Sequence, residues 1–204
     1  MRSTARWGKT MLMKEIALHI MDIAQNSISA GATLIEIEVS VDHERDAVFT
    51  SVKDNGCGMD EETVGRVVSP FETSRTTRKV GLGIPFFKMG AEECGGSFEL
   101  SSKPGEGTYI SASYAISNID RPPLGDMAET MLALAACNEG VDFVYRYTVD
   151  GNEFVFDTRE IRCILGEGIP LNLPDIMAWM REYLDQGIEE LNGCLLYTSP
   201  SPRD

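Results

Sequence analysis

Asp54-Asn55-Gly56-Cys57-Gly58-Met59 is the stretch from which the fold of this chain can be predicted. It follows residues 47–53, in which Val48, Thr50 and Val52 alternate with the residues of the other face, as in a half-buried strand. The strand ends at a carboxylate followed by two glycines, which permit positive φ and let a flat ligand approach the backbone. Such a carboxylate can accept a hydrogen bond from an exocyclic amine. Most Asp-x-Gly-x-Gly stretches, however, are ordinary turns.

Upstream of this strand, residues 12–30 are predicted to form a helix that Gly31 ends. Its own apolar residues occupy nearly its whole circumference, which indicates a buried helix. One polar stripe interrupts them, made of Glu15, His19, Asp22, Asn26 and Ser29. Either this stripe faces solvent, or it lines a cavity that holds a polar ligand, because buried polar groups without partners cost free energy.

The remaining elements follow from periodicity and from turn residues. The predicted strands are 34–42, 97–103, 108–115, 141–149 and 153–158, and the predicted helices are 60–68, about 84–94, 126–138 and 174–191. Residues 69–80 are polar, basic and aperiodic, and a loop of this length inside a compact domain is usually functional. Residues 118–125 are predicted to be a linker to a small C-terminal α-β-β-α annex, which either packs on the main domain or meets a partner.

Composition excludes several classes of function. A formal net charge of −14 over 204 residues argues against nucleic acid as a partner. No apolar run approaches the length of a membrane helix, and no secretory signal is visible, so no membrane partner is predicted. Five scattered cysteines without a C-x-x-C pair argue against a zinc site or a disulfide framework and favour a cytoplasmic location.

Both ends of the chain differ from the rest. Residues 1–12 show no periodicity, and we expect a non-native leader there, with translation starting at Met11 or Met13. Residues 194–204 resemble translated sequencing adapter, so we expect a tail of that origin. The intact mass of the natural protein would test both expectations.

Taken together, the motifs predict a pocket for Mg-nucleotide. Asp22 and Asn26 lie one turn apart on the first helix, and Asn26 offers a neutral oxygen suited to hydrated Mg²⁺. The basic residues Arg75, Arg78 and Lys79 precede Gly81-Leu82-Gly83-Ile84, which opens a helix. Glycine-rich backbone at a helix N-terminus favours phosphate, because its N–H groups and the helix dipole attract anions.

The order of these motifs resembles the GHKL superfamily of DNA gyrase, the ninety-kilodalton heat-shock chaperone, histidine kinases and mismatch-repair ATPases. The resemblance covers residues 12–116, which divides the chain into an ATP-binding domain (13–117) and a C-terminal extension (118–193). It implies an α/β two-layer sandwich of the Bergerat type, with a mixed, mostly antiparallel sheet and helices on one face. It also implies ATP and Mg²⁺ as cofactors.

The resemblance also implies the roles of individual residues. Asn26 in the N box would be the Mg²⁺ ligand, Asp54 in the G1 box would meet the adenine amino group, and Thr108 would support it. The other residues implied to bind the nucleotide are Gly56, Gly58 and Met59 of the G1 box, Phe71, Thr73 and Arg75 of the F box, Arg78 and Lys79, and Gly81, Leu82, Gly83 and Ile84 of the G2 box.

Two departures from the family pattern bear on the reaction. Asp22 stands where gyrase-type enzymes carry a glutamate that activates water, and its carboxylate is one methylene shorter. Lys79-Val80 replaces the glycine that usually precedes the G2 box. In addition, no segment resembles a phosphoacceptor domain of histidine kinases, and neither His19 nor His43 is placed like an autophosphorylated histidine.

These features predict a stand-alone kinase-type domain that transfers the γ-phosphoryl group of ATP to a separate protein partner. Two alternatives stay open, an ATP-hydrolysing conformational switch and a nucleotide-sensing module with little turnover. Asp22, the possible general base, favours the kinase or the sensor over the switch. A homodimer is compatible with all three.

Overall fold

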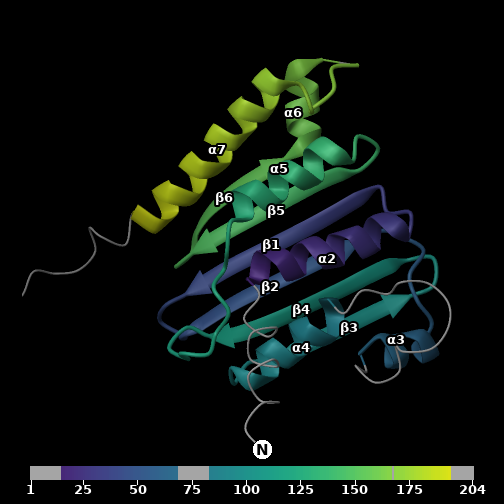
Figure 1. Cartoon of the computed structure of the whole chain (residues 1–204), viewed down its shortest axis with the longest axis vertical. Coiled ribbons are helices and arrows are strands. Elements are labelled where there is room, and N and C mark those ends of the chain that lie inside the picture. The colour runs from purple at the N-terminus through teal and green to yellow at the C-terminus, as the bar shows by residue number, and fades with distance from the viewer. Residues whose placement is uncertain (1–14, 69–82, 167, 194–204) are drawn as a thin grey trace, which may run out of the picture.

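One mixed sheet organises the molecule (Figure 1). The computed structural model describes residues 15–68, 83–166 and 168–193. The strand order is β3-β4-β2-β1-β5-β6, and every neighbouring pair is antiparallel except β1 and β5. The strands are β1 (Leu34–Asp42), β2 (Ala47–Asp54), β3 (Phe98–Lys103), β4 (Gly107–Ala115), β5 (Asp142–Val149) and β6 (Asn152–Asp157).

Three helices, α2, α4 and α5, lie side by side on one face of this sheet (Figure 1). The predicted α/β two-layer sandwich with a mixed, mostly antiparallel sheet is therefore confirmed. The helices are α2 (Ile16–Ser29), α3 (Glu61–Val68), α4 (Gly83–Glu93), α5 (Met127–Cys137), α6 (Thr158–Leu165) and α7 (Pro174–Gly193). Among the described residues, no helix combines the length and the apolar character needed to cross a bilayer.

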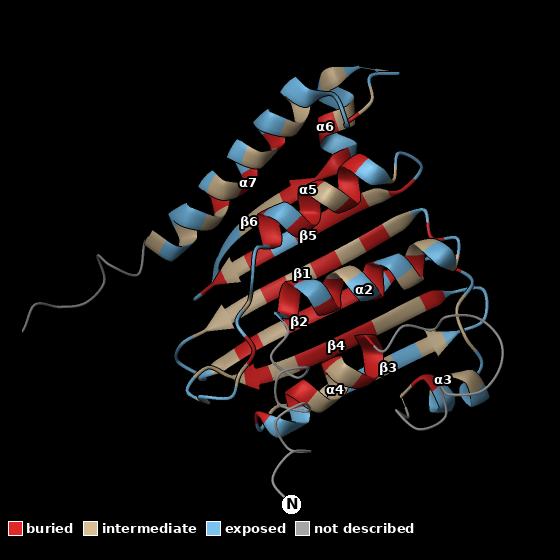
Figure 2. Ribbon diagram, in the orientation of Figure 1, coloured by how far each residue is buried: buried red, intermediate tan, exposed pale blue. Residues whose placement is uncertain are grey.

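The core lies between the helices and the sheet, where Figure 2 shows the buried residues. The alternation predicted for β1 is confirmed, because Ile35, Ile37 and Val39 are buried. On the opposite face of the same strands, Glu36 forms an ion pair with Lys53 at 2.9 Å, and both side chains are partly exposed. Burial of the apolar face against α2 supplies the main driving force that holds the two layers together.

Helix α2 has no side-chain cap at its N-terminus. The first free N–H groups of a helix need acceptors. Here Ile16 and Ala17 donate to the carbonyls of Pro123 and Leu124, both at 2.9 Å. The segment predicted to be a linker is thus packed against the helix that carries Asp22 and Asn26.

The separate C-terminal annex is not confirmed. Strand β5 pairs in parallel with β1 from Leu34 to Val41, so the two C-terminal strands continue the main sheet. Helix α7 packs on this extension through buried Met180, Leu184 and Gly187. At Gly187 a Cβ atom would lie 2.2 Å from the ring of Phe154, so the helix approaches β6 closely.

Helix α6 was not predicted from the sequence. Its signals are local: Asp157 caps its first turn by accepting from the Arg159 N–H at 2.9 Å, and Gly166 follows with φ +93°. It is short and mostly exposed, with only Thr158 and Ile161 buried. Eight residues give a weak periodic signal, which explains why the pattern did not separate it from a loop.

Candidate functional site

The carboxylate of Asp54 lies at the end of β2 and is 8% exposed. It accepts three hydrogen bonds: from Ser27 Oγ at 2.5 Å, from Gly56 N at 2.8 Å and from Thr108 N at 3.2 Å. Thr108 stands directly opposite Asp54 in the β2–β4 register. A buried carboxylate is stable when donors surround it, so this one is held in a single orientation.

The two glycines after Asp54 are required by close contacts. Gly58 has φ +64°, and a Cβ atom there would lie 2.0 Å from the carbonyl oxygen of Lys103. At Gly56 a Cβ atom would lie 3.0 Å from Asp54 Oδ1. At Gly58 the turn after β2 therefore packs so tightly against the β3–β4 hairpin that a side chain would force the backbones apart, whereas a side chain at Gly56 would crowd Asp54 and Ala30.

A cavity of about 300 Å³ opens next to Asp54. It brings together six of the residues predicted for the site, from two helices, two strands and one turn. They are Asn26, Asp54, Gly58, Met59, Ile84 and Thr108. The cavity also has Ser27, Ser29, Ala30, Cys57 and Thr63 in its lining.

Apolar side chains form much of the cavity wall. They are Ile23, Met59, Val67, Ile84 and Ile110. A mostly apolar concave site with a few fixed polar groups is the usual form of a small-molecule pocket. Its polar end at Asp54 and its apolar walls suit a flat heterocycle that carries an amino group.

The polar stripe of α2 faces solvent in one part and lines the cavity in another. Asp22 is exposed, whereas Asn26 is half-buried and lines the cavity. Asn26 Nδ2 is buried and has no hydrogen-bond partner among the residues that the structure describes. The amide of Asn26, unpaired within the described residues, thus indicates that a ligand binds here, since buried polar groups in native structures are normally paired.

An oxygen-bound Mg²⁺ fits this amide. Nδ2 and Oδ1 exchange places when the amide turns by 180°, so its oxygen can face the cavity. Within the described part of the chain, no cluster of three His, Cys, Asp or Glu side chains could hold a metal. A hydrated Mg²⁺ held by one protein oxygen and by phosphate oxygens needs no such cluster.

Helix α4 begins close to α2 at this same place. A Cβ atom at Gly83 would lie 2.8 Å from the Cβ of Asp22. Gly83 is the first described residue of α4, and the N–H groups in the first turn of a helix can bind an anion. The remaining predicted residues, Phe71, Thr73, Arg75, Arg78, Lys79, Gly81 and Leu82, lie outside the described residues.

Next to the site, Asp60 forms the N-terminal cap of α3. The Thr63 N–H donates to Asp60 Oδ1 at 2.8 Å. Hydrogen bonds from the Thr63 side chain and backbone hold the pKa of Asp60 below its usual value. The cap thereby positions Thr63 and Val67 of α3 at the cavity.

Two serines of the site were not predicted as site residues. Ser27 donates to Asp54, and Ser102 contacts both Met59 and the start of β4. For Ser102 a signal exists, because the alternation of β3 places its hydroxyl on the same face as Phe98 and Leu100. A hydroxyl on an apolar face needs partners, but the sequence does not say which ones.

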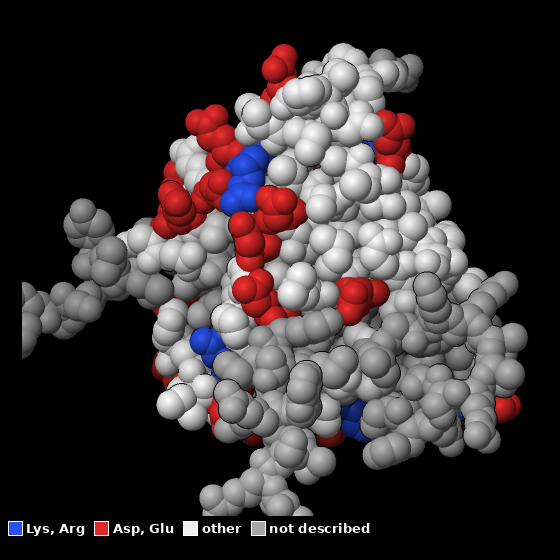
Figure 3. Space-filling view, viewed as in Figure 1, with Lys and Arg blue, Asp and Glu red and all other residues white. Residues whose placement is uncertain are grey.

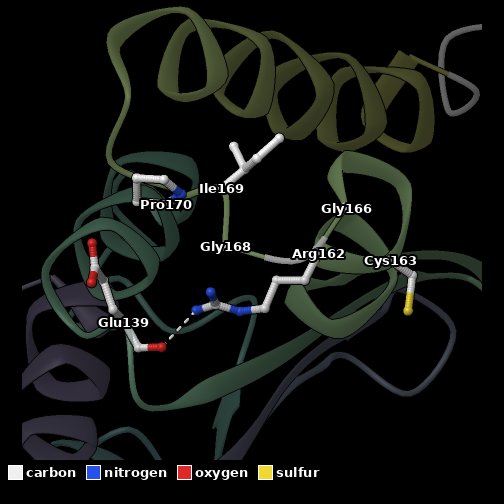
Figure 4. Close-up of a pocket in the computed structure, with 7 residues that line it drawn as sticks. All are labelled: Glu139, Arg162, Cys163, Gly166, Gly168, Ile169 and Pro170. Carbon is white, nitrogen blue, oxygen red and sulfur yellow. Dashed lines mark hydrogen bonds between the residues drawn. The ribbon is translucent and has the colours of Figure 1, made fainter.

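A larger hollow, of about 810 Å³, lies between α6 and the start of α7 (Figure 4). Its cation, Arg162, already donates to the carbonyl of Glu139 at 2.9 Å and to Asp142 at 3.3 Å. None of the predicted site residues lines it. The smaller cavity at Asp54 is therefore the better candidate, because it holds the buried Asp54 carboxylate and the Asn26 amide, which has no partner among the described residues.

One family of known proteins matches the part of the chain that contains this site. The profile of the family described as histidine kinase-, DNA gyrase B-, and HSP90-like ATPase matches residues 11–117, just over half of the chain. These residues contain every predicted site residue.

Two of the curated relatives show how far the likeness extends. The non-motile and phage-resistance protein of Caulobacter vibrioides is 31% identical over 115 residues, which cover 53% of this chain and 14% of that protein. The sensor protein kinase FleS of Pseudomonas aeruginosa is 32% identical over 126 residues, covering 61% of this chain and 31% of the kinase. The chain thus spans less than a third of the length of either relative.

Among solved structures, the N-terminal domain of a DNA repair protein aligns with a TM-score of 0.49 and 14% identity. The alignment covers 78% of this chain and 59% of that domain.

Proposed function

Because the chain belongs to the family of histidine kinase-, DNA gyrase B- and HSP90-like ATPases, we propose that it binds Mg-ATP in the cavity at Asp54 and transfers the γ-phosphoryl group to a separate protein. The observation that carries the proposal is the buried Asp54 carboxylate, held by three donors at the polar end of an otherwise largely apolar cavity.

Adenine recognition follows from the lone pairs of Asp54. An ionised carboxylate accepts about four hydrogen bonds, and the protein uses three of them. The acceptor position that is left would take one N–H of the exocyclic amine. Guanine presents a carbonyl oxygen at that place, which the carboxylate would repel.

The opposite end of the cavity would bind the phosphates and Mg²⁺. Asn26 has an amide without a partner among the described residues, and α4 begins nearby at Gly83. Bound Mg²⁺ would neutralise charge on the β- and γ-phosphate oxygens. The predicted contribution of Arg75, Arg78 and Lys79 to this end stays a prediction.

A separate acceptor is favoured by the two histidines of the chain. His19 is 3% exposed. His43 is accessible, but its Nδ1 lies 3.0 Å from Asp150 Oδ2, at the far end of β1 from Asp54. In the proposed reaction the bond between the γ-phosphorus and the bridging oxygen breaks, ADP leaves, and a bond forms to a side chain of the partner protein.

Hydrolysis is the second candidate function, because Asp22 lies beside the start of α4. There its exposed carboxylate could activate a water molecule as a general base. A sensing module without turnover stays the third alternative. A protein partner, or a second copy of the chain, would complete each of these functions.

The experiment follows the γ-phosphate of labelled Mg-ATP with wild type, Asp22→Asn and Asp54→Ala. We expect tight binding without free phosphate in wild type, and no binding in Asp54→Ala, because the base loses its acceptor. If wild type releases phosphate repeatedly and Asp22→Asn does not, the function is ATP hydrolysis and not phosphoryl transfer. Failure of wild type to bind ATP would contradict the proposal as a whole.

Asn26→Ala separates the contribution of Mg²⁺ to ATP affinity from the contribution of the adenine base. We expect this variant to lose the Mg²⁺-dependent part of its ATP affinity and to keep the part measured in EDTA. Equal affinity of the variant and wild type in Mg²⁺ would exclude Asn26 as the ligand.

A further inference from the structure

The hydroxyl of Ser102 joins the turn after β2 to the start of β4, beside the cavity. It accepts from the Met59 N–H at 2.8 Å, donates to the carbonyl of Gly107 at 2.9 Å and lies 2.9 Å from the hydroxyl of Thr108. A serine hydroxyl has one proton and two lone pairs. All three contacts can therefore be satisfied only in one arrangement.

That arrangement fixes the proton of Thr108. A backbone N–H can only donate and a carbonyl can only accept, so Met59 takes one lone pair of Ser102 and Gly107 takes its proton. The contact between the two hydroxyls must then run from Thr108 to the remaining lone pair of Ser102. Because its proton is donated to Ser102, the Thr108 hydroxyl can only accept a hydrogen bond from a ligand.

Thr108 lines the cavity opposite Asp54, so two acceptors stand side by side at its polar end. An exocyclic amine carries two N–H donors and can satisfy both. A carbonyl oxygen at the same place of the ring would face two acceptors and no donor, which costs free energy because buried acceptors are left unpaired.

We infer that Ser102 determines nucleotide specificity, because it orients the Thr108 hydroxyl so that the cavity accepts an amino-purine and rejects a keto-purine. Ser102 is a positioning residue, since it acts through Thr108. The inference rests on the proposed function, because it assumes that a purine ring occupies the cavity.

The test measures the dissociation constants of Mg-ATP and Mg-ITP by calorimetry on the full chain. Inosine differs from adenosine by a carbonyl in place of the amino group and by the proton that N1 then carries, and both differences are the same for wild type and variants. In Ser102→Ala the Thr108 hydroxyl is free to turn and donate to that carbonyl, so the preference for ATP over ITP should fall roughly tenfold. Loosening of the wall alone would weaken both nucleotides alike and leave the ratio unchanged.

Two further variants locate the effect. Ser101→Ala, on the exposed face of the same strand, should keep the wild-type ratio. In a Thr108→Val background Ser102→Ala should change the ratio no further, because the hydroxyl through which it acts is gone. Ser102→Cys keeps the side chain in place but hydrogen-bonds weakly, and it should lower the ratio if Ser102→Ala does not fold.

An unchanged ratio in Ser102→Ala, or a change that persists in the Thr108→Val background, would overturn the inference while the proposed function stands. Wild type that binds neither nucleotide would instead overturn the proposed function, and the inference with it.

Discussion

Gly105 lies in the turn between β3 and β4, Gly107 is the first residue of β4, and both have positive φ, +79° and +101°. Their surroundings differ. At Gly105 an added Cβ atom would meet nothing within 4 Å, whereas at Gly107 it would lie 2.0 Å from the carbonyl oxygen of Asp54. The pair separates the cost of backbone conformation from the cost of close approach at the site.

We expect Gly105→Ala to lower the free energy of unfolding by about 1 kcal/mol, the strain of a left-handed residue. Gly107→Ala should cost several kcal/mol and weaken ATP binding, because the backbone after β2 must move. Urea denaturation measures both, provided the m-values agree. Similar losses in the two variants would mean that the approach of Gly107 to Asp54 is not tight.

At the same scale, Asp54 was identified as a site residue from the sequence, because a carboxylate followed by spaced glycines is a local pattern. Its donors could not be predicted. Ser27 and Thr108 are 27 and 54 residues away along the chain, and only the pairing of β2 with β4 and the packing of α2 bring them to the carboxylate.

At the scale of elements, α5 has its own cap, unlike α2. Asp126 accepts from the Glu129 N–H at 2.7 Å and from Arg181 of α7 at 3.0 Å. Arg181 also binds Glu129 and Asp185, each at 2.7 Å. Figure 3 shows acidic side chains gathered over α5 and α7 with a small basic patch among them. The cap and the cation together join the two helices.

The backbone hydrogen bond from Glu129, and after it the bond from Arg181, lower the pKa of Asp126 below its usual 3.8. Because the pKa of Asp126 is lower in the folded protein, its charge stabilises the fold fully above pH 3.8. This stabilisation is lost as the pH falls through the folded-state pKa. We therefore expect Asp126→Ala to cost about 1 kcal/mol at neutral pH, and less below pH 3.8.

Urea titrations at several pH values measure this difference. Asp126→Asn is the matched control, because asparagine caps a helix equally well but carries no charge for Arg181. It should keep the stability that comes from capping, lie between wild type and Asp126→Ala at neutral pH, and lose the pH dependence that the Asp126 charge supplies. A difference between wild type and Asp126→Ala that does not change with pH would contradict the assignment of the charge.

At the scale of the whole molecule, the region matched by the family ends at residue 117, but the sheet does not. Strand β1 is central only because β5 pairs with it, and the N-terminus of α2 is capped by carbonyls at 123 and 124. A fragment of residues 1–117 would present an open strand edge and an uncapped site helix.

We expect the fragment 1–117 to lack cooperative unfolding in urea, followed by circular dichroism, whereas the full chain unfolds in one transition. Adding the fragment 118–204 should restore both the transition and ATP binding. A fragment 1–117 that unfolds cooperatively at the midpoint of the full chain would show that the C-terminal part is dispensable for folding.

Local chemistry determined what the sequence revealed by itself. Strand alternation, the helix predicted for residues 12–30, the spaced glycines around Cys57 and the order of the motifs depend on neighbours a few residues apart, and they were sufficient for the fold class and the family. The position of β5 beside β1, the cap of α2 and the contacts of Ser27 and Ser102 were decided by the tertiary structure alone. Each joins residues distant in the chain, whose pairing depends on the packing of the whole sheet and leaves no periodic pattern in the sequence.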